Sequence, residues 1–192
     1  MKSNALPFVV AIASVSGGGK TTAVERLTQV LPNAKALYFD QFDCEGPEDM
    51  MEWLANGADC NEWNLTPMLV ELDGLLAEPL DYIILDFPFA KQHARSSKSI
   101  DFTVFIDTPL DVALSRRLIR DFSDAPAAKI LEDVHHYARS GRAAYLHMLE
   151  TIKPDSDAVI DGSGTVSTIV TSIEEKCKIF RKRGIINESS LS

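Results

Sequence analysis

The sequence predicts an α/β fold built on a parallel sheet of five strands, and three observations predict it. Short apolar runs alternate with amphipathic helical patterns along the 192 residues, as strand–helix–strand units do. A glycine-rich segment stands between the first apolar run and the first helical pattern. The length and a hydrophobic content of 45% suit one domain with a buried core.

Five apolar segments are expected to form the strands: 8–14, 36–39, 81–85, 102–106 and 158–160. The apolar run that ends at Ala13 also imitates a short signal peptide. Cleavage there would remove the strand that must support the glycine-rich segment. We therefore interpret this run as a strand.

Helical periodicity predicts the elements between and after these strands, at 20–31, 47–54, 66–76, 109–122, 124–140, 142–152 and 165–181. Thr66-Pro67 and Thr108-Pro109 each supply a cap and a first-turn proline. Gly141 is expected to break the helix before it. We expect one domain over residues 1–186, with a lid over about 116–145 and a flexible tail at 187–192.

Composition and charge narrow the classes of partner. A net charge of -9 disfavours nucleic acid, which basic side chains usually hold through its phosphates. No apolar stretch approaches the roughly 18 residues of a membrane-spanning helix. Cys44, Cys60 and Cys177 are odd in number and widely spaced, so we expect free thiols in a reducing compartment, the cytoplasm.

The glycine-rich segment is the strongest functional signal in the chain. Residues 14–21 read Ser-Val-Ser-Gly-Gly-Gly-Lys-Thr and match the phosphate-binding loop G-x-x-x-x-G-K-[ST], except that Ser14 replaces the first glycine. Such a loop wraps backbone N–H groups around phosphate oxygens at a helix N-terminus. Lys20 would reach the β- and γ-phosphates, and the Thr21 hydroxyl would hold Mg²⁺. The predicted nucleotide-binding residues are Ser16, Gly17, Gly18, Gly19, Lys20, Thr21 and Thr22.

Two carboxylates stand where predicted strands end, at the edge of a parallel sheet where ligands collect. Asp86 closes the third apolar run and is the candidate Mg²⁺-organising acid, although aspartate is also common in turns. Asp40 follows the second run and could accept the proton of an attacking hydroxyl. Asp43 is a close second candidate for this base, and a capping role remains an alternative for both.

Three arginines lie in the helical pattern after the fourth strand. Spacings of three and four residues place Arg116 and Arg117 each near Arg120. Such a cluster can neutralise charge that develops on a transferred phosphoryl group. The alternative is a basic, solvent-facing surface paired with Asp121 and Asp124.

Other side chains are candidates for an acceptor pocket. Aromatic rings stack well on sugars or bases, and the candidates of this kind are Phe42, Trp53, Trp63 and Phe89. Core packing is the alternative for each of these rings. His93 and Arg95, in the polar segment after the third strand, are further candidates for acceptor contacts.

Four segments make the chain resemble the uridine kinase-like branch of P-loop nucleoside kinases, a family near phosphoribulokinase and pantothenate kinase. They are 16–22, 38–42, 83–88 and 105–121, and the resemblance covers roughly residues 9–173. The last segment is the most distinctive, because the family has an arginine-rich lid helix after a strand that ends in Ile-x-Asp.

The resemblance implies a P-loop NTPase-type three-layer sandwich with a five-stranded parallel core and a helical lid. It also implies ATP with Mg²⁺, an acidic base at Asp40, lid arginines at Arg116, Arg117 and Arg120, and a loop after 158–162 that edges the adenine. The chain departs from the pattern at Asp86, where uridine kinases usually carry glutamate. It also lacks, between residues 46 and 64, their Tyr-Asp-Phe…His-Ser-Arg segment for the nucleoside. Nucleosides, sugars and vitamin-like alcohols therefore all stay open as acceptors.

The sequence thus predicts a cytoplasmic kinase that transfers the γ-phosphoryl group of ATP to a hydroxyl of a small molecule. The alternative is a nucleotide-binding regulatory ATPase or switch without a metabolite acceptor. The chain lacks the Asn-Lys-x-Asp segment with which a GTPase reads its base. Expected partners are ATP, Mg²⁺ and a small alcohol, with no nucleic acid and no membrane, and the sequence leaves homo-oligomers open.

Overall fold

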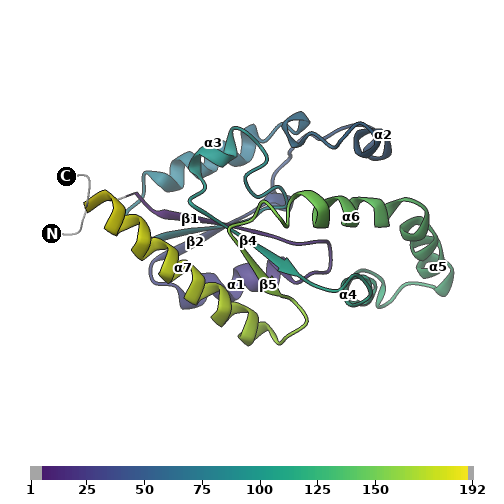
Figure 1. The fold of residues 1–192 in the computed structure, drawn as a ribbon. Helices are drawn as coiled ribbons and strands as arrows, with labels where there is room; N and C mark the ends of the chain where they lie inside the picture. The colour runs from purple at the N-terminus through teal and green to yellow at the C-terminus, as the bar shows by residue number, and fades with distance from the viewer. Residues whose placement is uncertain (1–5, 190–192) are drawn as a thin grey trace.

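The computed structural model describes residues 6–189 and contains one five-stranded parallel sheet (Figure 1). The strands lie in the order β2-β3-β1-β4-β5, and every pair of neighbours is parallel. Their bounds are β1 Phe8–Ala13, β2 Ala34–Tyr38, β3 Tyr82–Asp86, β4 Phe102–Asp107 and β5 Ala158–Asp161. The predicted α/β class with five parallel strands is confirmed.

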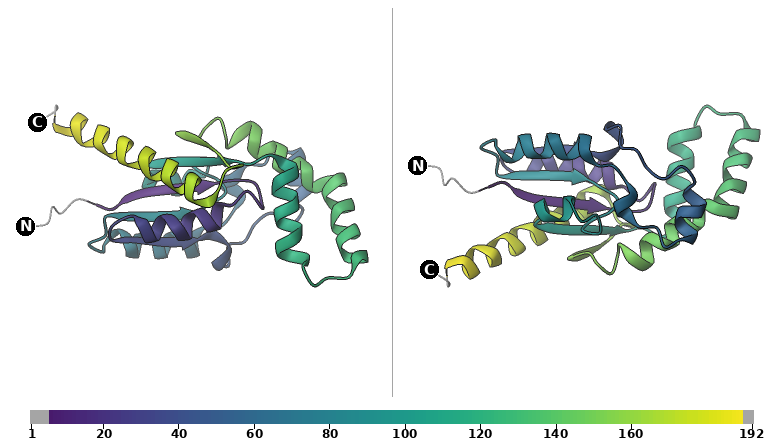
Figure 2. Two further views of the ribbon diagram at one scale, coloured as in Figure 1. Left: turned by 90° about the horizontal axis from the view of Figure 1, so that it is seen from below. Right: turned by 90° about the horizontal axis from the view of Figure 1, so that it is seen from above.

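Seven α-helices surround the sheet in the described residues: α1 Lys20–Val30, α2 Met50–Ala55, α3 Thr66–Leu76, α4 Leu110–Phe122, α5 Ala127–His136, α6 Arg142–Thr151 and α7 Val166–Ser189. Helices α1 and α7 cover one face, while α3 and α6 lie on the other, which gives three layers (Figures 1 and 2). Nearly all residues of β1, β3 and β4 are buried, because parallel strands covered on both faces meet no water.

The two faces of the sheet carry separate apolar cores. One core packs β1, β3 and β4 against Val24 and Leu27 of α1 and Ile173 of α7. The other packs β1, β2 and β3 against Met68 and Leu72 of α3. Burial on both sides fixes the sheet, so the loops at its carboxyl edge start from rigid positions.

A helical lid extends beyond the carboxyl edge of the sheet. In Figure 2, α4 and α5 stand side by side at the end of the molecule where the loop after β1 lies. The predicted helix break at Gly141 is wrong, because residues 137–141 form a π-helical segment that joins α5 directly to α6. The backbone of Gly141 is helical, with φ -58 and ψ -33, so the glycine does not need to end the helix.

Two predicted helix caps also differ from the structure. Leu65, not Thr66, occupies the cap position of α3, and Pro109, not Thr108, occupies that of α4. The Thr108 hydroxyl instead donates a hydrogen bond to the Gly18 carbonyl oxygen at 2.9 Å. This side chain therefore fastens the end of β4 to the glycine-rich loop.

The final helix is longer than the sequence pattern predicts and ends at Ser189. Of the tail expected over 187–192, residues 190–192 lie outside the described residues, as do residues 1–5. Within 6–189, none of the helices combines the length and the apolar character needed to cross a membrane.

Candidate active site

The glycine-rich loop connects β1 to α1 at the carboxyl edge of the sheet. Its chain turns tightly, with the Gly18 amide donating to the Val15 carbonyl oxygen at 2.8 Å. Gly17 has φ 81, and a Cβ there would collide with the carbonyl oxygen of Ala113 in α4. Only glycine tolerates both the positive φ and this close approach. The loop therefore packs closely against the first turn of α4.

The end of this loop is a helix N-terminus with free amides. Helix α1 starts at Lys20, and its cap residue Gly19 provides no side-chain hydrogen bond. The first N–H groups of a helix lack partners within the helix, and the helix dipole adds partial positive charge there. This arrangement is suited to an anion such as phosphate.

Lys20, Thr21 and Asp86 meet beneath the loop. Asp86 lies at the carboxyl end of β3, opposite Ile12 of β1, and is buried. The Thr21 hydroxyl donates to Asp86 Oδ2 at 2.6 Å, and the Lys20 ammonium forms an ion pair with Oδ1. Burial lowers the pKa of Lys20 to about 8, an effect that the Asp40 carboxylate opposes and the Arg120 guanidinium reinforces.

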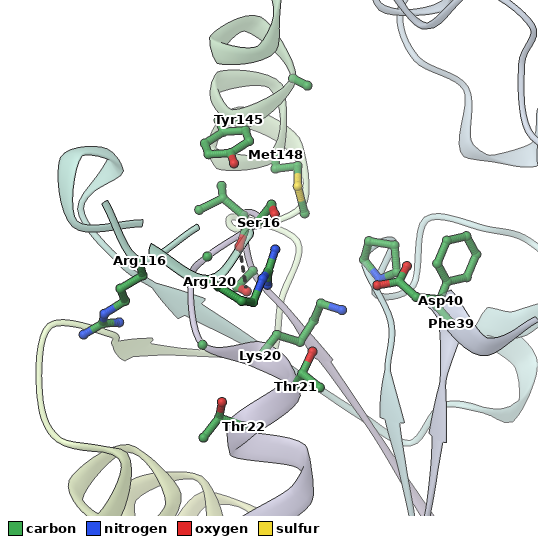
Figure 3. A pocket seen from close by; sticks show the side chains of 16 residues that line it. Ser16, Lys20, Thr21, Thr22, Phe39, Asp40, Arg116, Arg120, Tyr145 and Met148 are labelled. Carbon is green, nitrogen blue, oxygen red and sulfur yellow. Dashed lines mark hydrogen bonds between the residues drawn. The ribbon is translucent and has the colours of Figure 1, made fainter. Parts of the chain in front are cut away.

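Asp40 lies in a short 3₁₀ turn, Phe39–Gln41, that follows β2. It lines the same cleft as the glycine-rich loop, a cavity of about 520 Å³. Figure 3 shows the Lys20 side chain reaching into this cleft toward the side where Asp40 lies. Asp43 does not line the cleft, so of the two carboxylates only Asp40 stands at the site.

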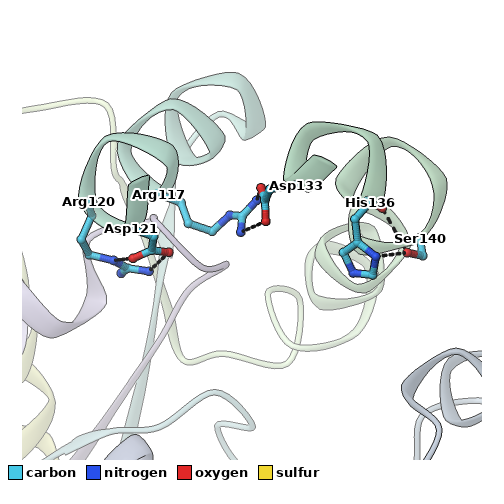
Figure 4. Close-up of polar contacts among 6 residues, drawn as sticks. All are labelled: Arg117, Arg120, Asp121, Asp133, His136 and Ser140. Atoms are coloured by element: carbon cyan, nitrogen blue, oxygen red, sulfur yellow. Dashed lines mark hydrogen bonds and ion pairs between the residues drawn. The ribbon is translucent and has the colours of Figure 1, made fainter. Parts of the chain in front are cut away.

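The three lid arginines divide into two groups. Arg116 and Arg120, four positions apart on one face of α4, line the cleft. Arg117 turns away and pairs through both terminal nitrogens with Asp133 of α5 (Figure 4). The structure therefore brings two of the three predicted arginines to the site, while the third joins two lid helices.

The two cleft-lining arginines make further contacts. Arg116 Nη1 donates to the Gly162 carbonyl oxygen at 3.2 Å, next to the loop after β5. Arg120 pairs with its neighbour Asp121 at 2.6 Å (Figure 4). The alternative interpretation of the arginines, a basic and solvent-facing surface, expected Asp121 as a partner. Arg120 makes this contact and also lines the cleft.

Helix α6 supplies two side chains that the sequence did not single out. Tyr145 and Met148 line the cleft from above in Figure 3, and burial raises the pKa of Tyr145. Their spacing of three residues places them on one helix face. That spacing is equally typical of core packing, so the sequence carried no signal that separates the two roles.

A second cavity of about 200 Å³ adjoins the cleft, because Phe39, Pro88, Ala144 and Met148 line both. Three of the four predicted acceptor-pocket aromatics line this second cavity, namely Trp53, Trp63 and Phe89. The fourth, Phe42, packs against the core that α3 covers.

His93 and Arg95 line neither cavity. The buried His93 ring lies 3.3 Å from the Trp63 carbonyl oxygen through Nε2, and Arg95 Nη1 donates to the Thr66 hydroxyl at 3.1 Å. These contacts hold both side chains against Trp63 and the start of α3, so the structure does not bring these two candidates to the site.

A third cavity of about 320 Å³ lies on the other side of the loop. Gly19, Thr22 and Arg116 form one wall, and residues 164–166 after β5 form another. The three cavities thus follow one another along the carboxyl edge of the sheet, with the glycine-rich loop between the outer two.

Comparisons with known proteins show which sequences and which fold this chain resembles. No family model matches the chain. A uridine kinase of Halalkalibacterium halodurans is 26% identical in an alignment of 208 positions that covers 88% of this chain and 97% of that protein. A uridine kinase of Enterobacter sp. is 28% identical over 109 residues, 56% of this chain and 50% of that protein. The crystal structure of a gluconokinase from Sinorhizobium meliloti 1021 shares the fold with a TM-score of 0.55 at 16% identity, covering 97% of this chain and 98% of that one.

Proposed function

Since the chain has the fold of P-loop kinases and a sequence similar to those of uridine kinases, we propose that it transfers the γ-phosphoryl group of ATP to a hydroxyl of a small molecule. One observation carries this proposal. A single cleft of about 520 Å³ holds the glycine-rich loop, Lys20, the Asp40 carboxylate and the arginines Arg116 and Arg120. These are the groups that phosphoryl transfer uses, because positioning and charge stabilisation supply most of its catalysis.

The nucleotide is proposed to lie along the loop. The amides of residues 16–22 and the first turn of α1 bind the phosphates. The base extends into the third cavity, between Arg116 and Thr165. This placement agrees with the family resemblance, in which the loop after the last strand edges the adenine.

The oxygen donors at the base of the cleft fit Mg²⁺. Thr21 and Asp86 offer a hydroxyl and a carboxylate whose oxygens lie 2.6 Å apart, and Mg²⁺ prefers such oxygens together with substrate phosphates and water. We propose that these two residues hold the ion, which when bound neutralises charge on the phosphates. Lys20, which pairs with Asp86 in this structure, then turns to the phosphate oxygens.

The acceptor hydroxyl is proposed to approach from the Asp40 side. Its oxygen forms a bond to the γ-phosphorus, while the bond from that phosphorus to the bridging oxygen of ADP breaks. The hydroxyl proton passes to the Asp40 carboxylate, a contribution worth roughly 10²–10⁴ in rate. Arg116 and Arg120 stabilise the negative charge on the transferred group.

The proposed cellular setting rests on the thiols. Cys44, Cys60 and Cys177 are all free, and burial raises the pKa of Cys60 to about 11 and that of Cys177 to about 12. Inert thiols without disulfides suit a reducing compartment, so we place the enzyme in the cytoplasm.

The test is ADP release from Mg²⁺-ATP over a panel of nucleosides, sugars and cofactor precursors that carry free hydroxyls. The proposal expects release that depends on one class of acceptor. Replacing Lys20→Ala should lower this rate by about 10²–10³-fold, since a charge aimed at the transferred group is lost. The variant should keep the native circular dichroism spectrum.

Two outcomes contradict the proposal. ADP release at full rate without any acceptor would favour a regulatory ATPase or switch. Full activity in Lys20→Ala would remove the loop from the reaction. Calorimetry with ATP alone separates a failure to bind nucleotide from a wrong acceptor panel.

A further inference from the structure

The second cavity, of about 200 Å³, is an aromatic extension of the phosphate-transfer cleft. Four phenylalanine and tryptophan side chains line it, namely Phe39, Trp53, Trp63 and Phe89. Phe39 also lines the cleft and precedes Asp40 in the chain. A molecule whose hydroxyl lies beside Asp40 would therefore extend its remaining atoms toward these rings.

The rings hold one another in fixed positions. Ring centroids lie 5.5 Å apart for Phe39 and Trp63, 5.4 Å for Trp63 and Phe89, and 6.4 Å for Trp53 and Trp63. These are ordinary distances for edge-to-face and tilted aromatic pairs, which stabilise their relative orientation. A pocket ordered in advance binds a flat ring with little loss of side-chain entropy.

The backbone behind Trp63 also restricts its ring. A Cβ on Gly46 would lie 2.7 Å from that ring, so only glycine leaves room for it. The neighbouring segments are joined where the Asn64 amide donates to the Glu45 carbonyl oxygen at 2.8 Å. The Trp53 indole N–H donates to the Asp59 carbonyl oxygen at 3.0 Å. Both tryptophans are thus fixed by their surroundings as well as by each other.

The wall of this cavity contains no aspartate, glutamate, lysine or arginine among the described residues. Its polar groups are the His147 ring, the Cys60 thiol and the indole N–H groups of Trp53 and Trp63, and the His147 ring packs against Trp53 with centroids 6.3 Å apart. A carboxylate or phosphate on the acceptor would lose water here without gaining an opposite charge, which is costly. The cavity accordingly selects against charged acceptors.

From these contacts we infer the class of acceptor: an uncharged alcohol whose body is a planar ring, bound in the aromatic cavity with its hydroxyl at Asp40. This inference rests on the proposed kinase function. It separates ring-bearing alcohols, nucleosides included, from sugar acids, sugar phosphates and plain sugars. Planar rings fit because aromatic walls offer wide apolar faces and few hydrogen-bonding groups.

Intrinsic fluorescence tests the inference without any phosphoryl transfer. The chain contains two tryptophans, and both line the cavity, so their emission reports its occupant. Uridine and 3-(hydroxymethyl)pyridine serve as ring alcohols, with gluconate, fructose and fructose 6-phosphate as the comparison. We expect at least one ring alcohol to give a saturable change with an affinity about tenfold or more above those of the other three.

A matched pair of variants locates the binding. Met50 and Met51 are neighbours on α2 with exposed fractions of 42% and 44%, but only Met50 lines the cavity. Met50→Lys should weaken ring-alcohol binding by about tenfold, because it brings a charge to an apolar wall. Met51→Lys should leave the affinity unchanged. Equal loss in both variants would contradict the assignment of the cavity.

The failure of this inference differs from that of the proposed function. ADP release that requires gluconate or the sugar phosphate would overturn the ring-alcohol class and leave the kinase reaction standing. Saturable ring-alcohol binding in a chain that does not bind ATP would overturn the kinase reaction and leave the cavity assignment standing. Tighter binding of the charged or plain sugars than of both ring alcohols would overturn the inference by itself.

Discussion

The cleft and the aromatic cavity beside it form two ends of one site that differ in chemical character, one charged and one apolar. One end, here called the phosphate end after its proposed role, consists of the glycine-rich loop, a helix N-terminus and the charged side chains Lys20 and Arg116, with the buried Asp86 paired to Lys20. The other end, here called the acceptor end after its proposed role, is lined by aromatic rings. Its described lining residues include no aspartate, glutamate, lysine or arginine. Phe39 lines both cavities and marks the boundary, and Asp40, which follows it in the chain, lines the cleft. Each end therefore suits one part of a two-substrate reaction.

The difference shows how one chain can combine the recognition of a nucleotide, which is the same in every reaction cycle of a kinase, with the selection of an acceptor. A polyphosphate tail is recognised by backbone amides and charge, which tolerate few alternatives in their geometry. An acceptor body is recognised by shape and apolar surface, which side chains from separate loops can adjust. The boundary residues should then matter for chemistry, and the residues beyond them for binding.

The largest expected effect tests the boundary itself. Asp40→Asn should leave ATP affinity nearly unchanged and lower the rate of transfer by roughly 10²–10⁴, since the hydroxyl loses its proton acceptor. Calorimetry with ATP and a single-turnover assay measure the two quantities. Asp43→Asn is the matched control, because Asp43 lies outside the cleft and its loss should leave the rate unchanged. A loss below tenfold in Asp40→Asn would move the base role elsewhere.

A smaller effect should separate two arginines of one helix. Arg120→Ala should lower kcat by about tenfold to a hundredfold, as expected for one charge-assisted hydrogen bond. Arg117→Ala should leave kcat within a few-fold and lower the melting temperature by about 2–4 °C, because Asp133 loses its partner in the lid. A reversed pattern would show that Arg117 reaches the reacting phosphate when the lid moves.

The smallest effect concerns pH at the phosphate end. Lys20 has a pKa lowered to about 8 by burial, so it is charged below this pH and loses its proton as the pH rises through it. ATP affinity should therefore fall by about threefold between pH 7.5 and 8.5, following the protonated fraction of the lysine.

Lys20→Arg provides the control for this titration. A guanidinium stays charged throughout this range, so the variant should show a flat profile even where its affinity differs overall. Calorimetric titrations with ATP at several pH values measure both profiles. An identical decline in the two proteins would assign the titration to another group.

Local sequence determined the phosphate end almost completely. The strand, the glycine-rich loop and helix α1 lie within residues 8–30, so apolar periodicity and loop composition describe them without long-range contacts. The carboxylates Asp40 and Asp86 were also predictable, because parallel strands bring their carboxyl ends to one edge of the sheet. The alternation of strand and helix patterns is likewise visible in local sequence, and it predicted the fold class.

Only the tertiary structure decided which side chains reach the cleft. Arg116 and Arg117 are neighbours in sequence, yet the packing of α5 draws Arg117 toward Asp133. Similarly, Thr108 bonds to Gly18 across 90 residues in place of capping a helix. Helical spacing specifies a face of α4 but does not specify what packs against it.

The acceptor cavity shows this limit most clearly. Its walls come from the loop after β2, from α2 and the segment after it, from the loop after β3 and from α6, which are far apart in the chain. Each aromatic residue alone has the pattern of a core residue, because burial against an apolar neighbour and exposure to a ligand require the same side chains. The sequence by itself therefore determined a fold and a glycine-rich loop, whereas the packing of distant segments decided the shape of the aromatic cavity.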